Sequence, residues 1–112
     1  MESIANRDLS VIIPAFNEAA ALAPLLRSLA EELPDAEILV IDDGSTDDTA
    51  EVAAAHGARV ISHAYNIGNG AAVKTGLRNA SRPYVVLMDA DGQHQARDIR
   101  KLAAHLPRYN MV

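Results

Sequence analysis

Two acidic residues, Asp89 and Asp91, directly follow an apolar run at residues 84–88 and are the residues best suited to chemistry. The run has the composition of a buried strand, and side chains at positions i and i+2 of an extended backbone point to the same side. Two carboxylates placed in this way can both bind one hard cation, Mg²⁺ or Mn²⁺. Phosphate oxygens commonly occupy the coordination positions that such a site leaves open. The pattern therefore predicts a metal site that binds a phosphorylated small molecule.

The next two residues, Gln93 and His94, are the other candidates for this site. The amide oxygen of Gln93 can complete the coordination shell, but amides in such loops also serve to hold the backbone in place. His94 is better suited to a supporting position, because hard cations prefer oxygen ligands. We expect Asp89 and Asp91 to be ligands, and both roles remain open for Gln93.

The composition indicates one folded domain. The chain has 112 residues, of which 49% are hydrophobic and 22% are charged, and this argues against disorder. A formal net charge of -5 without a dense basic run leads us to expect no nucleic-acid partner. There is no Cys and no apolar stretch of membrane-spanning length, so we expect a cytoplasmic protein with no membrane span in this chain. An anionic protein needs a cation to bind phosphate, and the predicted metal supplies it.

Short apolar runs alternate with helix-like segments at intervals of about 25 residues. We expect strands at residues 9–13, 37–41, 59–62 and 84–88. In this scheme Pro14 ends the first strand, and leucines at helical spacing predict an amphipathic helix that begins near Ala23, just before Pro24. The alternation predicts an α/β fold, a Rossmann-like open parallel sheet with helices on both faces.

The ends of the later helices are marked by capping and stop residues. Ser45 or Thr46 can cap the second helix, and Gly57 suits a left-handed end for it. A third helix is expected to end near Asn79, and a fourth to cover residues 99–106.

Polar side chains follow every predicted strand. They are Asn17 and Glu18, then Asp42 and Asp43, then Asn66, then Asp89 and Asp91. The carboxyl ends of parallel strands meet at one edge of the sheet, and ligands of such sheets bind there. The sequence therefore predicts a ligand site formed by four loops.

Several of these residues also have a structural interpretation. Asp42 or Asp43 can begin a turn or cap a helix, although Asp43 also suits binding to a nucleobase N–H or a ribose hydroxyl. Asn17 can bridge two loops, and Glu18 can be either a ligand or a first-turn acid that the helix dipole stabilises.

The remaining candidates are two glycines, a lysine and three histidines. Gly68 and Gly70 can let a loop approach the ligand and a helix pack tightly on the sheet, whereas a dinucleotide fingerprint would follow the first strand. Lys74 is within reach of a phosphate, but a solvated lysine is the default. We expect three histidines at the surface: His56, His63 and His105.

Four segments together resemble the ordered motifs of family 2 glycosyltransferases of the GT-A fold. The segments are residues 10–18, 41–47, 66–72 and 89–94. Among these enzymes the chain is most similar to dolichyl- and polyprenyl-phosphate sugar transferases. The resemblance covers residues 8–106 and corresponds to the donor-binding half of such an enzyme. One departure lies at residues 95–98, where relatives often carry prolines and an acidic residue.

The resemblance implies roles for individual residues. In the family, the nucleotide pocket is lined at the positions of Pro14, Phe16 and Glu18. The residues at the positions of Ile41 and Asp43 contact the base and the ribose. The diphosphate and its Mg²⁺ or Mn²⁺ are held at the positions of Asp89, Ala90, Asp91 and Gln93.

The resemblance also implies a domain division and a reaction. Residues 1–8 would be a polar N-terminal segment, 9–106 the domain that binds a GDP- or UDP-sugar, and 107–112 a tail at a truncation point. The reaction would be inverting sugar transfer, with a lipid phosphate as acceptor and a general base outside this chain. The whole protein would then act at the inner face of a membrane, and an uncovered sheet edge would allow a dimer.

Two other functions fit part of the pattern. Asp-x-Asp-Gly after an apolar strand also occurs in haloacid dehalogenase-like phosphatases, but there the motif opens the domain, whereas here three predicted strands precede Asp89. The other alternative is a module that binds the nucleotide sugar without turning it over.

Overall fold

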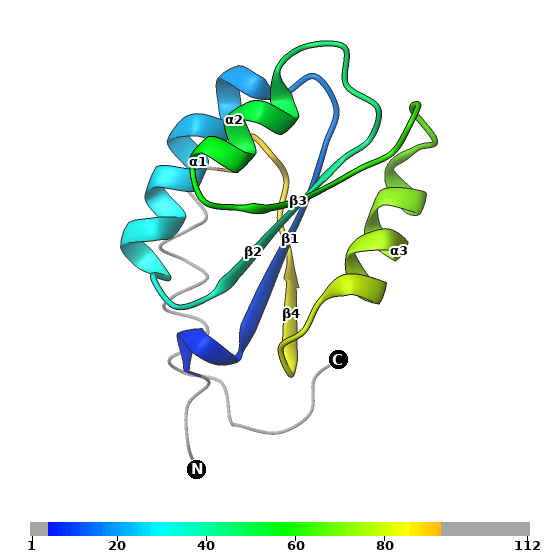
Figure 1. The fold of residues 1–112 in the computed structure, drawn as a ribbon. Coiled ribbons are helices and arrows are strands. Elements are labelled where there is room, and N and C mark those ends of the chain that lie inside the picture. The colour runs from blue at the N-terminus through cyan, green and yellow to red at the C-terminus, as the bar shows by residue number, and fades with distance from the viewer. Residues whose placement is uncertain (1–4, 93–112) are drawn as a thin grey trace.

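Four parallel strands form one sheet in the computed structural model, which describes residues 5–92 (Figure 1). The strands are β1 (Leu9–Ala15), β2 (Glu37–Asp42), β3 (Arg59–Ser62) and β4 (Tyr84–Leu87). The helices are η1 (Asn6–Asp8), a short 3-10 helix, followed by α1 (Ala19–Glu32), α2 (Thr49–Ala55) and α3 (Asn69–Asn79). The predicted parallel α/β fold is confirmed, and the helix predicted at 99–106 lies outside the described residues. No helix within residues 5–92 has the length and apolar character needed to cross a membrane.

The sheet has the spatial order β3-β2-β1-β4, and both of its faces are covered. α1 and α2 lie on one face and α3 lies on the other, as predicted (Figure 1). The chain runs outward from β1 to β3 and then crosses to β4 on the far side of β1, and ligands of open α/β sheets bind at such a reversal. In the part of the chain described here, the outer edges of β3 and β4 have no strand partner, and a dimer through such an edge stays a prediction.

β1 is buried from both sides and forms the centre of the core. Val11 and Ile13 belong to the cluster on the α1 side, whereas Ile12 belongs to a smaller cluster on the α3 side. The leucines of the predicted helical stripe all join the larger cluster: Leu22, Leu25, Leu26, Leu29 and Leu33. Full burial of one such side chain contributes roughly 1.5–3 kcal/mol. The amphipathic pattern of α1 is therefore confirmed and accounts for its position on the sheet.

β1 continues through Pro14 to Ala15, so the predicted end of the strand at Pro14 is wrong. The carbonyl of Ile12 accepts a hydrogen bond from Met88 N at 3.0 Å, and alternate residues direct their backbone groups to the same neighbour. Pro14 therefore faces β4, where its missing N–H removes the next bond. Pairing with β2 continues to Ala15. The proline ends the ladder with β4, and β1 itself goes on.

α1 begins at Ala19, before the expected start near Ala23, and contains Pro24. The first turn forms normally, because Leu22 N donates to the carbonyl of Glu18 at 2.9 Å. Pro24 removes the bond to the carbonyl of Ala20, and Ala20 is exposed, so water can take its place. Burial of the leucines outweighs the loss of one helical hydrogen bond.

α2 is not capped by Ser45 or Thr46, so this prediction is wrong. The carboxylate of Asp47 accepts instead from the N–H of Thr49 at 2.9 Å and from its hydroxyl. Ser45 and Thr46 are engaged by the loop after β1, which only the tertiary structure reveals. The predicted stop at Gly57 is confirmed, with φ at +83°.

Asn17 joins the loop after β1 to the loop after β2. Its Oδ1 accepts from the N–H groups of Thr46 at 2.8 Å and Asp47 at 3.3 Å, and from the Thr46 hydroxyl at 3.3 Å. Its own N–H donates to Ser45 Oγ at 2.9 Å. Its φ of +53° is a conformation that Asn tolerates better than most residues. The predicted bridging role of Asn17 is confirmed.

α3 approaches β1 closely because Gly76 has no side chain. A Cβ at Gly76 would lie 2.4 Å from Ile12 Cγ2. A Cβ at Gly68 or Gly70 would meet nothing within 4 Å. The prediction that these two glycines allow tight packing of the helix is therefore wrong, and Gly76 has this role.

Gly76→Ala is expected to lower the free energy of unfolding by about 1–3 kcal/mol, because the new methyl group overpacks against Ile12. The loss should occur although Ala is the better helix former by about 1 kcal/mol. Gly70→Ala in the same helix is the matched control and should be neutral or stabilising. Urea unfolding of both variants measures the difference, and equal stabilities would contradict the packing argument.

Asn17→Gly is expected to lower the free energy of unfolding by roughly 0.5–1.5 kcal/mol, because the exposed amides of Thr46 and Asp47 exchange their side-chain acceptor for water. Glycine keeps the positive φ, so this variant isolates the hydrogen bonds. Asn17→Ala should be less stable still, by about 1–2 kcal/mol, because Ala disfavours the left-handed conformation. Urea unfolding is the measurement, and wild-type stability of the glycine variant would exclude the bridging role.

Candidate functional site

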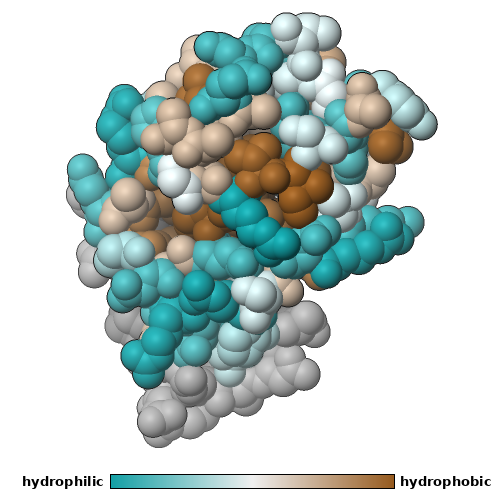
Figure 2. All heavy atoms as spheres, in the orientation of Figure 1, coloured by the Kyte–Doolittle hydropathy of each residue, from teal (hydrophilic) through white to brown (hydrophobic). Residues whose placement is uncertain are grey.

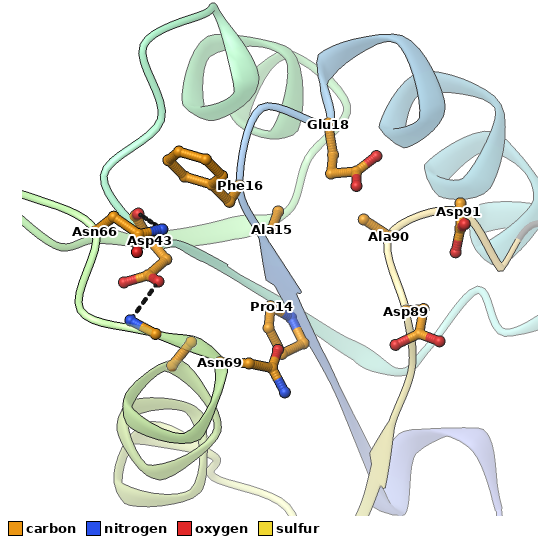
Figure 3. A pocket seen from close by; sticks show the side chains of 12 residues that line it. Pro14, Ala15, Phe16, Glu18, Asp43, Asn66, Asn69, Asp89, Ala90 and Asp91 are labelled. Carbon is orange, nitrogen blue, oxygen red and sulfur yellow. Dashed lines mark hydrogen bonds between the residues drawn. The ribbon is translucent and has the colours of Figure 1, made fainter.

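A cavity of about 520 Å³ opens at the carboxyl edge of the sheet (Figure 3). All four predicted loops contribute to its lining: Pro14, Ala15, Phe16, Glu18, Asp43, Asn66, Gly68, Asn69, Ala72, Asp89, Ala90 and Asp91. The prediction that these loops converge on one site is therefore confirmed.

Most residues predicted at the site from the sequence line this cavity, but Asn17, Ile41, Asp42, Gly70 and Lys74 do not. Ile41 is fully buried beneath it, in the cluster with Ile12 and Ala72, because its side chain faces α3. Lys74 is exposed and does not line the cavity. Gln93 lies outside the described residues.

Asp89 and Asp91 lie in a turn and not in a strand. β4 ends at Leu87, and Gly92 N donates to the carbonyl of Asp89 at 3.0 Å. Both acidic residues are exposed, whereas Ala90 between them is 5% exposed. The turn thus leaves both carboxylates exposed and buries the apolar side chain between them.

Neither of these carboxylates has a hydrogen-bond or ion-pair partner within residues 5–92, and the cavity around them is strongly acidic. Glu18, Asp43, Asp89 and Asp91 line it, and no Lys or Arg of residues 5–92 does. Two unpaired carboxylates supply the oxygen ligands that Mg²⁺ and Mn²⁺ prefer. The donor set therefore fits a divalent cation with open coordination positions, although no group of three acidic or imidazole ligands is present in the described part of the chain.

Phe16 presents an aromatic ring beside the polar groups of the cavity. It is 44% exposed and lines the cavity. In Figure 3 its ring lies on the side of Asn66 and Asp43. The face shown in Figure 2 carries an apolar area near its middle, bordered by hydrophilic side chains. An exposed aromatic ring next to hydrogen-bonding groups suits a planar heterocyclic ligand.

Asp43 is buried and its carboxylate organises the loop before α3. Oδ1 accepts from Ile67 N at 3.0 Å, and Oδ2 accepts from Gly68 N at 2.8 Å. Burial raises the pKa of the Asp43 carboxyl, but hydrogen bonds from His63, Ile67 and Gly68 outweigh burial and hold the pKa below its ordinary value. The group is therefore ionised at neutral pH and positioned at the cavity wall.

His63 is a component of the site that the sequence did not indicate. It was expected at the surface, but its side chain is 12% exposed, and Nδ1 lies 2.7 Å from Asp43 Oδ1. The two residues are far apart in the sequence, so no local pattern could have identified the pair. By contrast, His56 is exposed as predicted, and His105 lies outside the described residues.

Asp42 has the structural role that its turn-forming character suggested. Its Oδ1 accepts from Ser45 N at 3.0 Å, and its Oδ2 accepts from Ser62 Oγ at 3.3 Å. Gly44 allows the same loop to lie against the loop after β3, because its φ is +75° and a Cβ there would be 2.3 Å from the carbonyl carbon of Tyr65. The loops after β2 and β3 are thus in direct contact behind Asp43.

Known proteins with similar sequences include glycosyltransferases. An uncharacterized glycosyltransferase of Mycobacterium tuberculosis is 39% identical over 105 residues, which are 94% of this chain and 46% of the relative. Undecaprenyl-phosphate 4-deoxy-4-formamido-L-arabinose transferase of Salmonella choleraesuis is 35% identical over 108 residues, covering 88% of this chain and 33% of the relative. The chain spans less than half the length of each.

A solved structure with the same fold contains both a metal and a nucleotide. Glucosyl-3-phosphoglycerate synthase of Mycobacterium tuberculosis, in complex with Mn²⁺, UDP and glucosyl-3-phosphoglycerate, superposes with a TM-score of 0.67 and 35% sequence identity. The match covers 75% of this chain and 33% of the synthase. Residues 10–112 also match the family described as glycosyl transferase family 2. The match extends over nearly the whole chain, and the chain therefore belongs to this family.

Proposed function

We propose that this chain binds the nucleoside diphosphate sugar that a glycosyltransferase uses as donor. The observation that carries the proposal is a cavity to which residues 5–92 contribute four carboxylates and no basic side chain. A diphosphate would be repelled there unless a cation intervened, and Asp89 and Asp91 are free to hold one. Family membership favours sugar transfer over the phosphohydrolase alternative.

Different residues of the cavity would bind different parts of the nucleoside diphosphate sugar. Asp89 and Asp91 would hold Mg²⁺ or Mn²⁺, with Ala90 as the buried residue that sets their spacing and Gln93 as a further candidate ligand. The bound ion would neutralise charge on the leaving diphosphate. Support for this metal comes from the related synthase, which was crystallised with Mn²⁺ and UDP.

The nucleoside would lie at the opposite end of the cavity. Phe16 would contact the base, and Asp43 would accept from a base N–H or a ribose hydroxyl with its remaining lone pair. Pro14 and Glu18 line the wall between these groups and the acidic turn. A UDP-sugar or a GDP-sugar fits this assignment.

The acceptor is proposed to be a polyprenyl phosphate, and transfer is proposed to invert the anomeric centre. The similarity to an undecaprenyl-phosphate transferase supports the lipid acceptor. Such an acceptor would place the reaction at the inner face of a membrane. No general base is assigned among residues 5–92, because each carboxylate of the cavity already has a proposed role in donor binding.

UDP is expected to raise the melting temperature of the chain only when Mn²⁺ is present. A ligand at about 100 times its dissociation constant adds about 2.7 kcal/mol, which corresponds to roughly 10 °C or more for a domain of this size. Asp91→Asn should abolish the shift without lowering the melting temperature of the free protein, because its carboxylate has no partner in the described part of the chain. Asp48→Asn, which removes an exposed charge outside the cavity, is the control. An unchanged response in the Asp91 variant would remove Asp91 from the site.

Phe16→Ala is expected to weaken UDP binding by about 1–3 kcal/mol, because a base loses its stacking surface. Phe16 is exposed, so the stability of the free protein should change little. Tyr65→Ala is the matched control, since Tyr65 is 69% exposed and does not line the cavity. Isothermal titration with UDP and Mn²⁺ measures both variants, and equal affinities would place the base elsewhere.

A further inference from the structure

His63 occupies a fixed position between the end of β2 and α3. It directly follows β3, and its N–H donates to the carbonyl of Asp42 at 2.8 Å. Both ring nitrogens have partners, since Nδ1 lies 2.7 Å from Asp43 Oδ1 and Nε2 lies 2.8 Å from Thr75 Oγ1. The residue is therefore held at its backbone N–H and at both ring nitrogens, and it does not line the cavity.

The partners determine where the protons lie. An ionised carboxylate only accepts, so Nδ1 of His63 must donate to Asp43. In the neutral ring Nε2 then accepts from the hydroxyl of Thr75. The chain of bonds runs from α3 through the imidazole to the carboxylate at the cavity wall.

Asp43 depends on this bond for its orientation. Its carboxylate has about four acceptor positions, and three are taken, by His63 and Ile67 at Oδ1 and by Gly68 at Oδ2. The fourth belongs to Oδ2, and Asp43 lines the cavity. Without His63 each oxygen would keep one backbone partner, and the orientation of the carboxylate would be less restrained.

We propose that His63 is a positioning residue of the donor site, which fixes Asp43 so that its free acceptor position meets the nucleoside. The inference rests on the proposed function, because it needs a nucleotide in the cavity. According to this proposal, His63 contributes to the nucleotide affinity although it does not contact the ligand. The Nδ1 bond carries this effect, and the Nε2 bond to Thr75 only orients the ring.

Substitution of His63 by Asn or by Gln tests the contributions of Nδ1 and Nε2 separately. The amide nitrogen of Asn lies as many bonds from Cα as Nδ1 of His, whereas the amide nitrogen of Gln corresponds to Nε2. His63→Asn can thus still donate to Asp43, and His63→Gln can reach only the side of Thr75. A purely structural role would make both variants similar, so their difference is the diagnostic quantity.

The experiment is isothermal titration of the protein with UDP and Mn²⁺, accompanied by thermal melting of each free variant. His63→Gln and His63→Ala are expected to bind UDP about tenfold more weakly, the effect of one lost hydrogen bond to a charged group, and His63→Asn within about threefold of wild type. Glu37→Gln is the control for lost stability, because Glu37 accepts from Ser10 and Ser81 at the opposite end of the sheet. It should melt lower and bind UDP normally.

The outcomes distinguish this inference from the function on which it rests. Wild-type protein that does not bind UDP with Mn²⁺ would overturn the proposed function and the inference with it. Wild-type binding together with equal affinities for the Asn and Gln variants would overturn the role of His63 alone. Reduced affinity in Glu37→Gln would also overturn it, because lost stability would then account for the effect.

Discussion

Side-chain oxygens that accept from backbone N–H groups hold the functional edge of this sheet together. Loops at the ends of parallel strands contain amides without partners in the sheet, and buried amides need acceptors. Asn17 accepts from an N–H of the loop after β2, Asp47 accepts from one at the start of α2, and Asp43 accepts from one in the loop before α3. The contacts of Asn17 and Asp43 join segments that lie far apart in the chain. The geometry of the cavity follows from them, because the same loops carry its lining residues.

The same interactions divide the acidic residues into two groups. Asp42, Asp43 and Asp47 are engaged in hydrogen bonds, and the pKa of Asp43 and of Asp47 lies below its ordinary value. For Asp47, the main cause is the hydrogen bond from the Thr49 side chain. Asp89 and Asp91 have no such partner in the described residues and so remain available to a ligand from outside. An acidic motif in the sequence is thus not by itself a binding site, and the partners of each carboxylate decide which role it has.

The periodic features of the sequence predicted the architecture well, because the apolar residues of a buried helix face or strand recur at the spacing of that element. The leucine stripe of α1, the strands and the rim of polar residues were all found in this way. Local rules failed where a tertiary contact competes with them. Pro24 lies inside a helix because leucine burial outweighs its cost, and Ser45 bonds to Asn17 in place of capping α2.

The candidate site was predicted in position but not in its supporting contacts. The i, i+2 spacing of Asp89 and Asp91 survives although the segment is a turn, because Ala90 is buried between them. Ile41 was assigned to the ligand from the resemblance, whereas its place in the strand directs its side chain into the core. His63 was missed because its partners, Asp43 and Thr75, come from two other elements. Such contacts depend on how the helices and strands pack against one another. The pattern of residues along a single strand gives no information about this packing.

Pro14 has a mechanical consequence for the acidic turn. The bond from Met88 N to the Ile12 carbonyl is the last one between β4 and β1, since the proline offers no further donor. Beyond this point, within residues 5–92, no backbone hydrogen bond joins the segment that carries the two carboxylates to β1. The position of Asp89 and Asp91 therefore depends on the burial of Ala90 and on the bond from Gly92 N to the Asp89 carbonyl, and not on pairing with the central strand.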